Sequence, residues 1–411
     1  MSDYFLVTYR EDTWQEESGR YTFGWTNTTY CWPDAPTDRL SSFRYKLPAG
    51  WELRIHEARN RNSRYKAWRG NDREIWVKQA ELPGFLRHTA RAHTCLPPNH
   101  ASIEAAFCAI QPGISSPFAL KHTGGVTLPA GHASGNYHQQ AIQRTARGEV
   151  VISGSAQDSG YLYFANADRA IVHLITPQHE TFNHLGGLQI VDELLAVGYQ
   201  RATIDSQGSS EVLFFDIDDI CQPVALDHLT IERTQAGDRA DGVALVKLQE
   251  CWLVVVADQH AARLDFYLST SLDLHNPNTR FTPTPVASWS KAANGLGPGS
   301  IDQNWGAYQN FNLFSQVGQP PHADDLWLVG MHTTLFPVLE DWADLYHLNF
   351  SKSGVVLTKK GKKRFTRSGN GPGFLYGSGF YFDRAARAFE VYACEAQLGD
   401  NATIMRCNLW L

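Results

Sequence analysis

The chain has 411 residues and a formal net charge of −6 at pH 7. This length exceeds the usual span of one domain, so we expect two folded units. A net negative charge argues against nucleic acid or an anionic membrane as a partner. No apolar run reaches the about 20 residues that a transmembrane helix needs, and the start lacks a secretory-signal pattern. We therefore expect a cytoplasmic protein, or one exported without a cleaved Sec signal, with no membrane span.

The composition favours strands over helices. Aromatic residues make up 12% of the chain, and 33 Gly residues separate the apolar stretches. Aromatic segments broken by Gly turns are typical of β-sheets, so we expect an all-β protein. The seven Cys residues show no Cys-x-x-Cys spacing, which predicts neither a disulfide framework nor a zinc site. Cys251, Cys394 and Cys407 fall within apolar strand patterns, where we expect small buried thiols.

Residues 1–85 contain the same order of features twice. Each half has an alternating strand, a charged turn, an aromatic stretch and an acidic loop. The first half places Glu11 in its turn and Thr37–Ser42 in its loop. The second half places Glu57 in its turn and Asn71–Trp76 in its loop. This duplication predicts one small domain built from two similar halves.

The loop from Asp38 to Ser42, followed by a Gly-Trp turn, resembles one Greek-key motif of the βγ-crystallins. The resemblance covers residues 1–85 and implies two Greek keys packed as a small sandwich. In that family the acidic loop binds Ca²⁺ through a hydroxyl, a carboxylate and carbonyls of the other motif, and Ca²⁺ takes about six to eight oxygens. Carried over, the resemblance implies calcium ligands at Asp38, Ser42, Glu11 and Glu57.

Two departures from the family pattern limit the calcium prediction. Thr37 replaces the usual first acidic or amide residue, and Ile75-Trp76 stand where the second loop should have serines. We therefore expect at most one intact site. The alternative is that Ser41 and Ser42 only hydrogen-bond the folded hairpin.

Residues 86–135 are richer in Pro, Gly and scattered His, which indicates a linker. Within it, residues 103–110 are apolar enough for a strand. From residue 136 to residue 411 one pattern recurs: a short polar or Gly-rich strand, a hairpin, a strongly apolar strand and an amphipathic strand. The apolar strands are Glu149–Ser153, Leu194–Gly198, Trp252–Val256, Leu326–Gly330 and Phe389–Tyr392.

This pattern resembles the blade of a β-propeller, written from the axis outward. The first strands recur about every 60 residues, within the range of propeller repeats. Five units fit, so we expect a five-bladed propeller over residues 136–411, joined to the crystallin-like domain. Six blades are the alternative, if residues 280–305 hide a degenerate unit. The last unit ends at residue 411, so the strand near Phe107 is expected to supply its outer edge and close the ring.

The first strands of a propeller face its central channel, so their polar side chains are candidate ligand-binding residues. Trp305 lies in a long loop, where an aromatic face suits the apolar side of a sugar ring. The candidate residues are His138, Gln139, His184, Asp241, Trp305, Gln309, Asn310 and Asn312.

We expect a protein that binds a carbohydrate or small polar ligand, and three alternatives stay open. A glycoside hydrolase needs two carboxylates about 5–10 Å apart, so Asp241 would require a loop acid such as Asp302 or one of Glu340-Asp341. A metal-dependent enzyme would hold a divalent ion in the channel with His138, His184 and Asp241. A protein-interaction platform would show a broad exposed patch on one face.

Overall fold

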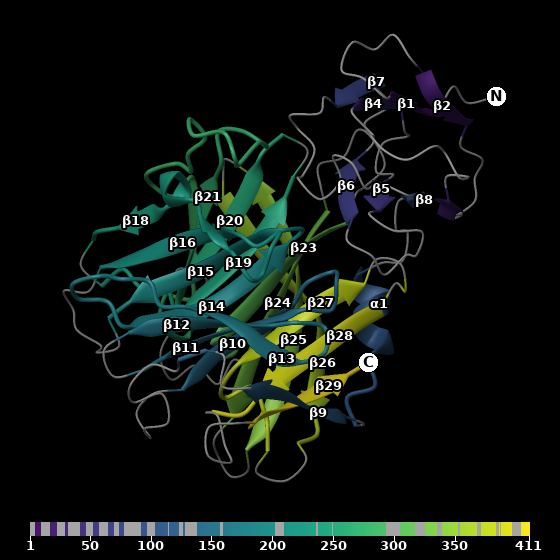
Figure 1. The fold of residues 1–411 in the computed structure, drawn as a ribbon. Coiled ribbons are helices and arrows are strands. Elements are labelled where there is room, and N and C mark those ends of the chain that lie inside the picture. The colour runs from purple at the N-terminus through teal and green to yellow at the C-terminus, as the bar shows by residue number, and fades with distance from the viewer. Residues whose placement is uncertain are drawn as a thin grey trace. The chain divides into compact units, whose positions relative to one another are not determined.

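The computed structural model divides into two compact units, one within Met1–His100 and one that holds Ala101–Gln316 and Asp324–Leu411 (Figure 1). In the first unit it describes the strands only. From residue 103 to residue 411 it describes all residues except 114, 123–125, 128–137, 157–158, 202–208, 236, 249, 293–304, 317–324, 335–338, 352–353, 368–370, 384–385, 387 and 397–403. In the described part of the chain, no helix has the length and apolar character needed to cross a membrane.

The described strands of the first unit form two four-stranded antiparallel sheets, ordered β2-β1-β4-β7 and β3-β8-β5-β6. In each half the fourth strand lies beside the first, as in a Greek key, while the third pairs in the sheet of the other half. The strands are β1 (Phe5–Tyr9), β2 (Glu17–Thr22), β3 (Thr29–Cys31), β4 (Ser42–Lys46), β5 (Glu52–His56), β6 (Tyr65–Arg69), β7 (Glu74–Val77) and β8 (Ala92–Leu96).

The two sheets of this unit share a core. Phe43 of β4 meets Trp68 of β6 edge to face, with 4.8 Å between ring centroids. Leu6 on one sheet and Ile55 on the other are fully buried. Strand β8 pairs with β5, so the first unit continues through a segment that the sequence predicts to be linker.

The described strands of the second unit form five antiparallel groups. Each group has three consecutive strands, and a further strand pairs at the outer edge. Group 1 is β10 (Gln139–Arg144), β11 (Val150–Ser155), β12 (Gly160–Ala165) and β13 (Ala170–Ile175). Group 2 is β14 (His184–Val191), β15 (Leu194–Gln200) and β16 (Ser210–Asp216), with β17 (Val224–Ala225) and β18 (Ile231–Arg233) both pairing with β16. Group 3 is β19 (Gly242–Lys247), β20 (Trp252–Ala257), β21 (Arg263–Leu268) and β22 (Ala287–Ser290).

Group 4 is β23 (Asn310–Gln316), β24 (Asp325–Thr334), β25 (Glu340–Ser351) and β26 (Gly354–Phe365). Group 5 is β27 (Ser378–Asp383), β28 (Ala388–Cys394), β29 (Ile404–Trp410) and β9 (Ser116–His122). Strand β22 lies inside residues 280–305 as the outer strand of group 3. Among the described residues, that segment therefore belongs to an existing group.

The first strands of the groups form a closed ring. Strands β10, β14, β19, β23 and β27 lie side by side in that order, and β27 also lies beside β10. The closing contact includes a parallel bridge between Ala141 and Ser378. Five buried hydrophobic clusters lie between neighbouring groups, one for each of the pairs 1–2, 2–3, 3–4, 4–5 and 5–1.

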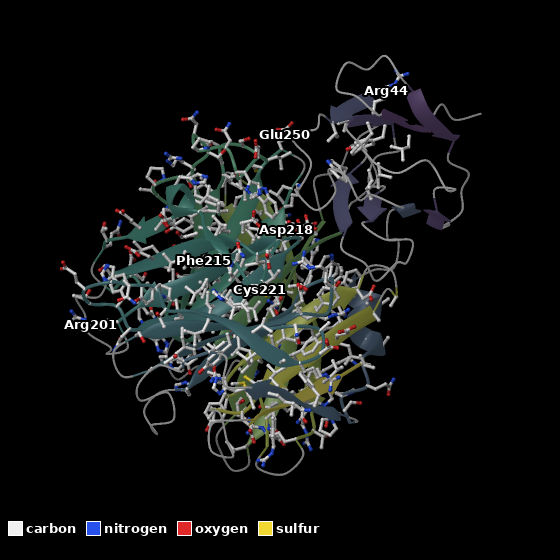
Figure 2. The ribbon with its side chains drawn as sticks, viewed as in Figure 1. Arg44, Arg201, Phe215, Asp218, Cys221 and Glu250 are labelled. Carbon is white, nitrogen blue, oxygen red and sulfur yellow. The ribbon has the colours of Figure 1, made fainter. Side chains whose placement is uncertain are left out.

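These clusters explain the continuous apolar runs of the second strands. Side chains of a strand alternate between its two faces, and each face of β20 meets a different cluster. Leu253 and Val255 pack between groups 3 and 4, while Trp252 and Val254 pack between groups 2 and 3. In group 2, Phe215 of β16 is buried in the cluster shared with group 1 (Figure 2).

The strand predicted near Phe107 is wrong, because Ile103–Ala109 form the helix α1. Its buried side chains are Ile103, Ala106 and Phe107, a spacing of three and four residues that suits a helix rather than a strand. Three Ala residues also favour the helix. The strand that completes group 5 comes later, because β9 pairs along β29 from Ser116 to Lys121.

The basic run from Lys359 to Arg364 lies within β26. Lys359 Nζ stands 2.9 Å from Asp344 Oδ2, inside group 4. Lys363 Nζ donates to the carbonyls of Cys108 and Ile110, at the end of α1. Two lysines of the run therefore make contacts within the unit.

Glycine at position 379 is required where groups 5 and 1 meet. A Cβ added there would stand 2.0 Å from the carbonyl oxygen of Ile142. We expect Gly379→Ala to lower the free energy of unfolding by about 1–3 kcal/mol, because the two backbones must move apart. Urea denaturation measures this. Gly113→Ala is the matched control, since a Cβ there meets nothing within 4 Å, and equal stability of both variants would contradict the closing contact.

Candidate functional site

The beginnings of the five first strands converge at one end of the ring. Asn310 at the start of β23 donates through Nδ2 to the carbonyl of Gln140, 2.7 Å away in β10. Gly187 N of β14 donates to the carbonyl of Asp241, 2.6 Å away and just before β19. We call this end the mouth, defined by the half-buried residues His138, His184, Asp241, Gln309 and Tyr376, each at or just before the start of a first strand.

Two imidazoles and a phenol meet at the mouth. The ring centroids of His138 and His184 are 6.4 Å apart, and those of His138 and Tyr376 are 5.7 Å apart. His138 Nε2 lies 2.8 Å from the side-chain amide of Gln140. The sequence-predicted pair is therefore brought together, and Tyr376 joins it.

Burial keeps these imidazoles neutral. It lowers the pKa of His184 from its ordinary 6.5 to about 4, and the nearby Asp241 carboxylate opposes the shift. Burial also lowers the pKa of His138. At neutral pH each ring therefore offers one donor and one acceptor nitrogen rather than a positive charge.

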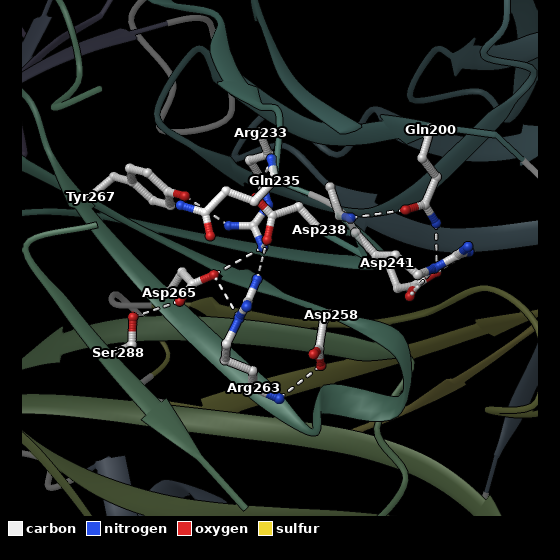
Figure 3. Close-up of polar contacts among 12 residues, drawn as sticks. Gln200, Arg233, Gln235, Asp238, Asp241, Asp258, Arg263, Asp265, Tyr267 and Ser288 are labelled. Atoms are coloured by element: carbon white, nitrogen blue, oxygen red, sulfur yellow. Dashed lines mark hydrogen bonds and ion pairs between the residues drawn. The ribbon is translucent and has the colours of Figure 1, made fainter. Parts of the chain in front are cut away.

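The carboxylate of Asp241 is held by two neighbours (Figure 3). Arg239 binds it with two hydrogen bonds of 3.0 Å, and Gln200 Nε2 donates to Oδ1 at 2.5 Å. Gln200 is fixed in turn, because its Oε1 accepts from the backbone of Ala240 at 2.8 Å. The negative charge of Asp241 is thus compensated within the site.

A buried ion network next to this site joins groups 2 and 3 (Figure 3). Arg233 of β18 lies 2.9 Å from Asp265 of β21 and donates to the hydroxyl of Tyr267 at 2.7 Å. Arg263 approaches the same Asp265 oxygen at 3.0 Å, and Ser288 donates to the other at 2.6 Å. Asp238 pairs with both arginines as the second carboxylate. Because the two arginines and two aspartates compensate one another, the network is better suited to fixing the two groups than to binding a ligand.

Three predicted ligand residues lie deeper along the ring and are almost fully buried: Gln139, Asn310 and Asn312. Asn312 Oδ1 accepts from the backbone of Phe380 at 2.7 Å, which links β23 to β27. Gln139 Nε2 donates to the hydroxyl of Tyr161 at 3.2 Å. Their amides connect strands, and Gln139 and Asn310 directly follow the mouth residues His138 and Gln309.

Trp305 lies in the hydrophobic core rather than on a sugar-binding surface. It packs in the cluster between groups 3 and 4, where its centroid is 4.3 Å from that of Trp289 and 4.8 Å from that of Tyr308. Its indole Nε1 donates to the carbonyl of Ala261 at 3.0 Å. Its sequence position in a long loop does not reveal this burial.

The two catalytic alternatives depend on carboxylates and imidazoles near the mouth, and the loop acid Asp302 lies outside the described residues. Among the residues that define the mouth, Asp241 is the one carboxylate, and it is bound by Arg239. Asp341 is fully buried in β25 and paired with Arg367 at 2.5 Å. Among the side chains that the structure describes, no group of three His, Cys, Asp or Glu is placed to hold a metal ion.

The predicted calcium ligands Asp38, Glu11 and Glu57 lie outside the described residues, as does the side chain of Ser42, which begins β4. Three residues of the site were not among the predicted ones: Tyr376, Arg239 and Gln200. Tyr376 precedes a first strand just as His138 does, and this equivalence was available in the sequence. Gln200 ends β15, and nothing in its sequence context points to Asp241.

No family model matches the chain, and no curated protein matches it. Among solved structures, it is similar to a luciferin-regenerating enzyme, with 13% identity over 66% of this chain and 77% of that chain and a TM-score of 0.33. It is also similar to the β-propeller domain of Vanderwaltozyma polyspora Nup133, with 10% identity over 93% of this chain and 100% of that chain and a TM-score of 0.28. Similarities this weak assign no fold or activity to this chain.

The lowered pKa of His184 predicts a loss of stability in acid. In the unfolded chain a His takes up its proton near pH 6.5, whereas in the folded chain His184 does so at about pH 4. Stability is therefore fully present above pH 6.5 and is lost as the pH falls from there toward 4. We expect His184→Gln to reduce the loss between pH 7 and pH 5 by roughly 1–2 kcal/mol.

Chemical denaturation of the wild type and the variant at both pH values measures the difference. His275→Gln is the matched control, because the His275 side chain is 61% exposed. If the pH 7 to pH 5 loss is the same in the wild type and in His184→Gln, the neutral buried imidazole is contradicted.

Proposed function

We propose that the second unit is a five-bladed β-propeller that binds a small polar ligand, a carbohydrate or similar hydroxylated molecule, at the mouth. The closed ring of first strands and the five hydrophobic clusters support the propeller. The observation that carries the ligand proposal is the convergence of five half-buried polar or aromatic residues at one end of the ring, above a sealed interior.

The charges of the mouth favour a neutral ligand rather than an ion. Arg239 and Asp241 compensate each other, and burial favours neutral forms of both imidazoles. The remaining groups are amides and a phenol, which donate and accept hydrogen bonds in comparable number. Such a set matches ligand hydroxyls, while the ring of Tyr376 suits the apolar face of a sugar.

Two buried acceptors beside the mouth add to this argument. Gln139 Oε1 and Asn310 Oδ1 follow His138 and Gln309 in sequence and have no hydrogen-bond partner among the described residues. A buried acceptor without a donor is costly. A ligand hydroxyl that reaches past the mouth would therefore gain more from these oxygens than from exposed ones.

Binding rather than hydrolysis is the function we favour. Glycoside hydrolysis requires a second carboxylate near Asp241, and the set that defines the mouth lacks one. A metal centre would require Asp241 to leave Arg239 and Gln200, which hold it with three hydrogen bonds.

The ligand site predicts that mouth residues set the affinity. A panel of neutral mono- and oligosaccharides is screened by thermal shift, and each sugar that raises the melting temperature is titrated by calorimetry. We expect His138→Ala and Gln309→Ala each to weaken binding about tenfold, as the loss of one hydrogen bond does. His275→Ala is the control, since its exposed ring pairs with Asp216 instead. Failure of every sugar to bind, or unchanged affinity in both mouth variants, would reject the proposal.

We further propose that the first unit is a βγ-crystallin-like domain that Ca²⁺ stabilises. The supporting observation is its topology, in which each half has the 2-1-4 order of a Greek key and gives its third strand to the other sheet. The proposed ligands are Asp38, Ser42, Glu11 and Glu57.

This proposal predicts one calcium-dependent increase in stability. Ca²⁺ titration by calorimetry should give about one site per chain, and Asp38→Ala should abolish it, because a hard cation loses a carboxylate oxygen. Asp72→Ala in the second loop is the control and should bind as the wild type does. Equal binding by wild type and Asp38→Ala would exclude this loop as the site.

A further inference from the structure

Cys394 and Cys407 stand directly opposite each other in the last antiparallel pair of strands. The register of β28 and β29 pairs Cys394 with Cys407. Both are fully buried free thiols in the hydrophobic cluster between groups 5 and 1. Directly opposed residues of an antiparallel pair present their side chains on the same face.

The backbone hydrogen bonds show which kind of pair this is. Cys394 N donates to the carbonyl of Gly377 at 2.9 Å, away from β29, whereas Glu395 N donates to Arg406 at 3.0 Å, toward it. Cys394 and Cys407 are therefore a non-hydrogen-bonded pair. In such pairs the Cα atoms stand about 4.5 Å apart, within the about 4.4–6.8 Å that a disulfide spans.

The sulfur of Cys394 lies close to Gly377. A Cβ added at Gly377 would stand 2.5 Å from Cys394 Sγ, so this sulfur leans toward the segment before β27. The Cα spacing of a non-hydrogen-bonded pair allows a bond to Cys407 with both strands left in place. The sulfur–sulfur bond needs no change in register.

We propose that Cys394 and Cys407 form a cross-strand disulfide when the chain folds under oxidising conditions. With oxidised glutathione, the thiolate of one Cys attacks the glutathione disulfide and releases one glutathione thiolate, leaving a mixed disulfide. The second Cys, as thiolate, displaces the other glutathione and closes the bond. In total, two protein thiols are oxidised and one glutathione disulfide is reduced to two thiols.

The bond would fasten the C-terminal strand. β29 lies between β28 and β9. It therefore connects the rest of group 5 to β9, the first strand of this unit. Linking residues 394 and 407 restricts the unfolded chain and so stabilises the fold.

Because both thiols are buried in the folded protein, we expect them to be oxidised during folding rather than after it. Burial raises the pKa of Cys394 and that of Cys407, and the thiolate is the reactive form. The folded, reduced protein is therefore expected to react slowly at these positions. Cys108 and Cys221 are exposed, and Cys221 is labelled in Figure 2, so they serve as internal reference thiols.

Refolding with and without oxidised glutathione, followed by alkylation and peptide mass mapping, tests the proposal. We expect a peptide pair linked through Cys394 and Cys407 only after oxidative refolding, with a melting temperature about 5 °C above that of the reduced protein. When the native, reduced protein is treated with the same oxidant, Cys108 and Cys221 should be modified before Cys394 and Cys407. Cys251→Ala should keep the linked peptides, and Cys407→Ala should lose both the link and the temperature gain.

Recovery of Cys394 and Cys407 as alkylated free thiols after oxidative refolding of the wild type would overturn the proposal. So would linkage of either one to a different Cys. Both outcomes are read from the wild-type protein, so they do not depend on whether a variant folds.

Discussion

The side chain of Gln189 joins three of the five first strands at the axis of the second unit. Its Oε1 accepts from Leu245 N at 3.0 Å and from Leu313 N at 2.8 Å, while its Nε2 donates to Leu313 O at 2.8 Å. Strands β14, β19 and β23 thus meet through one buried amide. First strands that converge on an axis leave backbone groups without ladder partners, and buried groups of this kind must be paired. Gln189 pairs with such groups of Leu245 and Leu313. The need to pair backbone groups at the axis therefore determines which side chains fill the interior of the ring.

The same constraint separates the candidate binding residues from those that connect strands. Gln143 donates to the carbonyl of Phe380 at 3.0 Å, and Asn312 accepts from its N–H at 2.7 Å. These amides fill the interior with contacts between strands. The residues of the mouth differ, because His138 and His184 remain half-buried. The site that we propose is therefore at one end of the ring, and the second strands pack between groups to hold that end in shape.

Local patterns predicted much of the fold. The alternation of side chains and the repeat of polar and apolar strands give the five groups, because most of each second strand is buried on both faces and is therefore largely apolar. The helix α1 was missed because a short apolar run suits either a strand or a buried helix. The identity of β9 also escaped prediction, because its pairing with β29 depends on closure between segments about 290 residues apart in sequence.

The sequence predicts which strands contribute to the candidate site, but it does not predict which of their residues are accessible. Adjacent positions such as Gln309 and Asn310 carry similar amides, yet the first is half-buried and the second is sealed. Their difference arises from neighbouring strands that sequence position does not identify. The partners of Asp241 show the same limit: Arg239 is two residues away, whereas Gln200 comes from another group. Trp305 is buried because Trp289 and Tyr346 pack against it, and both come from strands that sequence position does not place beside it.

The measurement that tests this account most directly is the stability of Gln189→Met, which keeps the side-chain volume but removes the amide. Leu245 N and Leu313 N would then lose their shared acceptor, and each unpaired buried donor costs about 1–3 kcal/mol. The account predicts a free energy of unfolding at least about 2 kcal/mol below that of the exposed control Gln222→Met. It also predicts faster hydrogen exchange at both leucine amides. Stability and exchange equal to those of the control would show that the Gln189 amide does not hold the three strands together, and would contradict the division between a sealed interior and the proposed binding mouth.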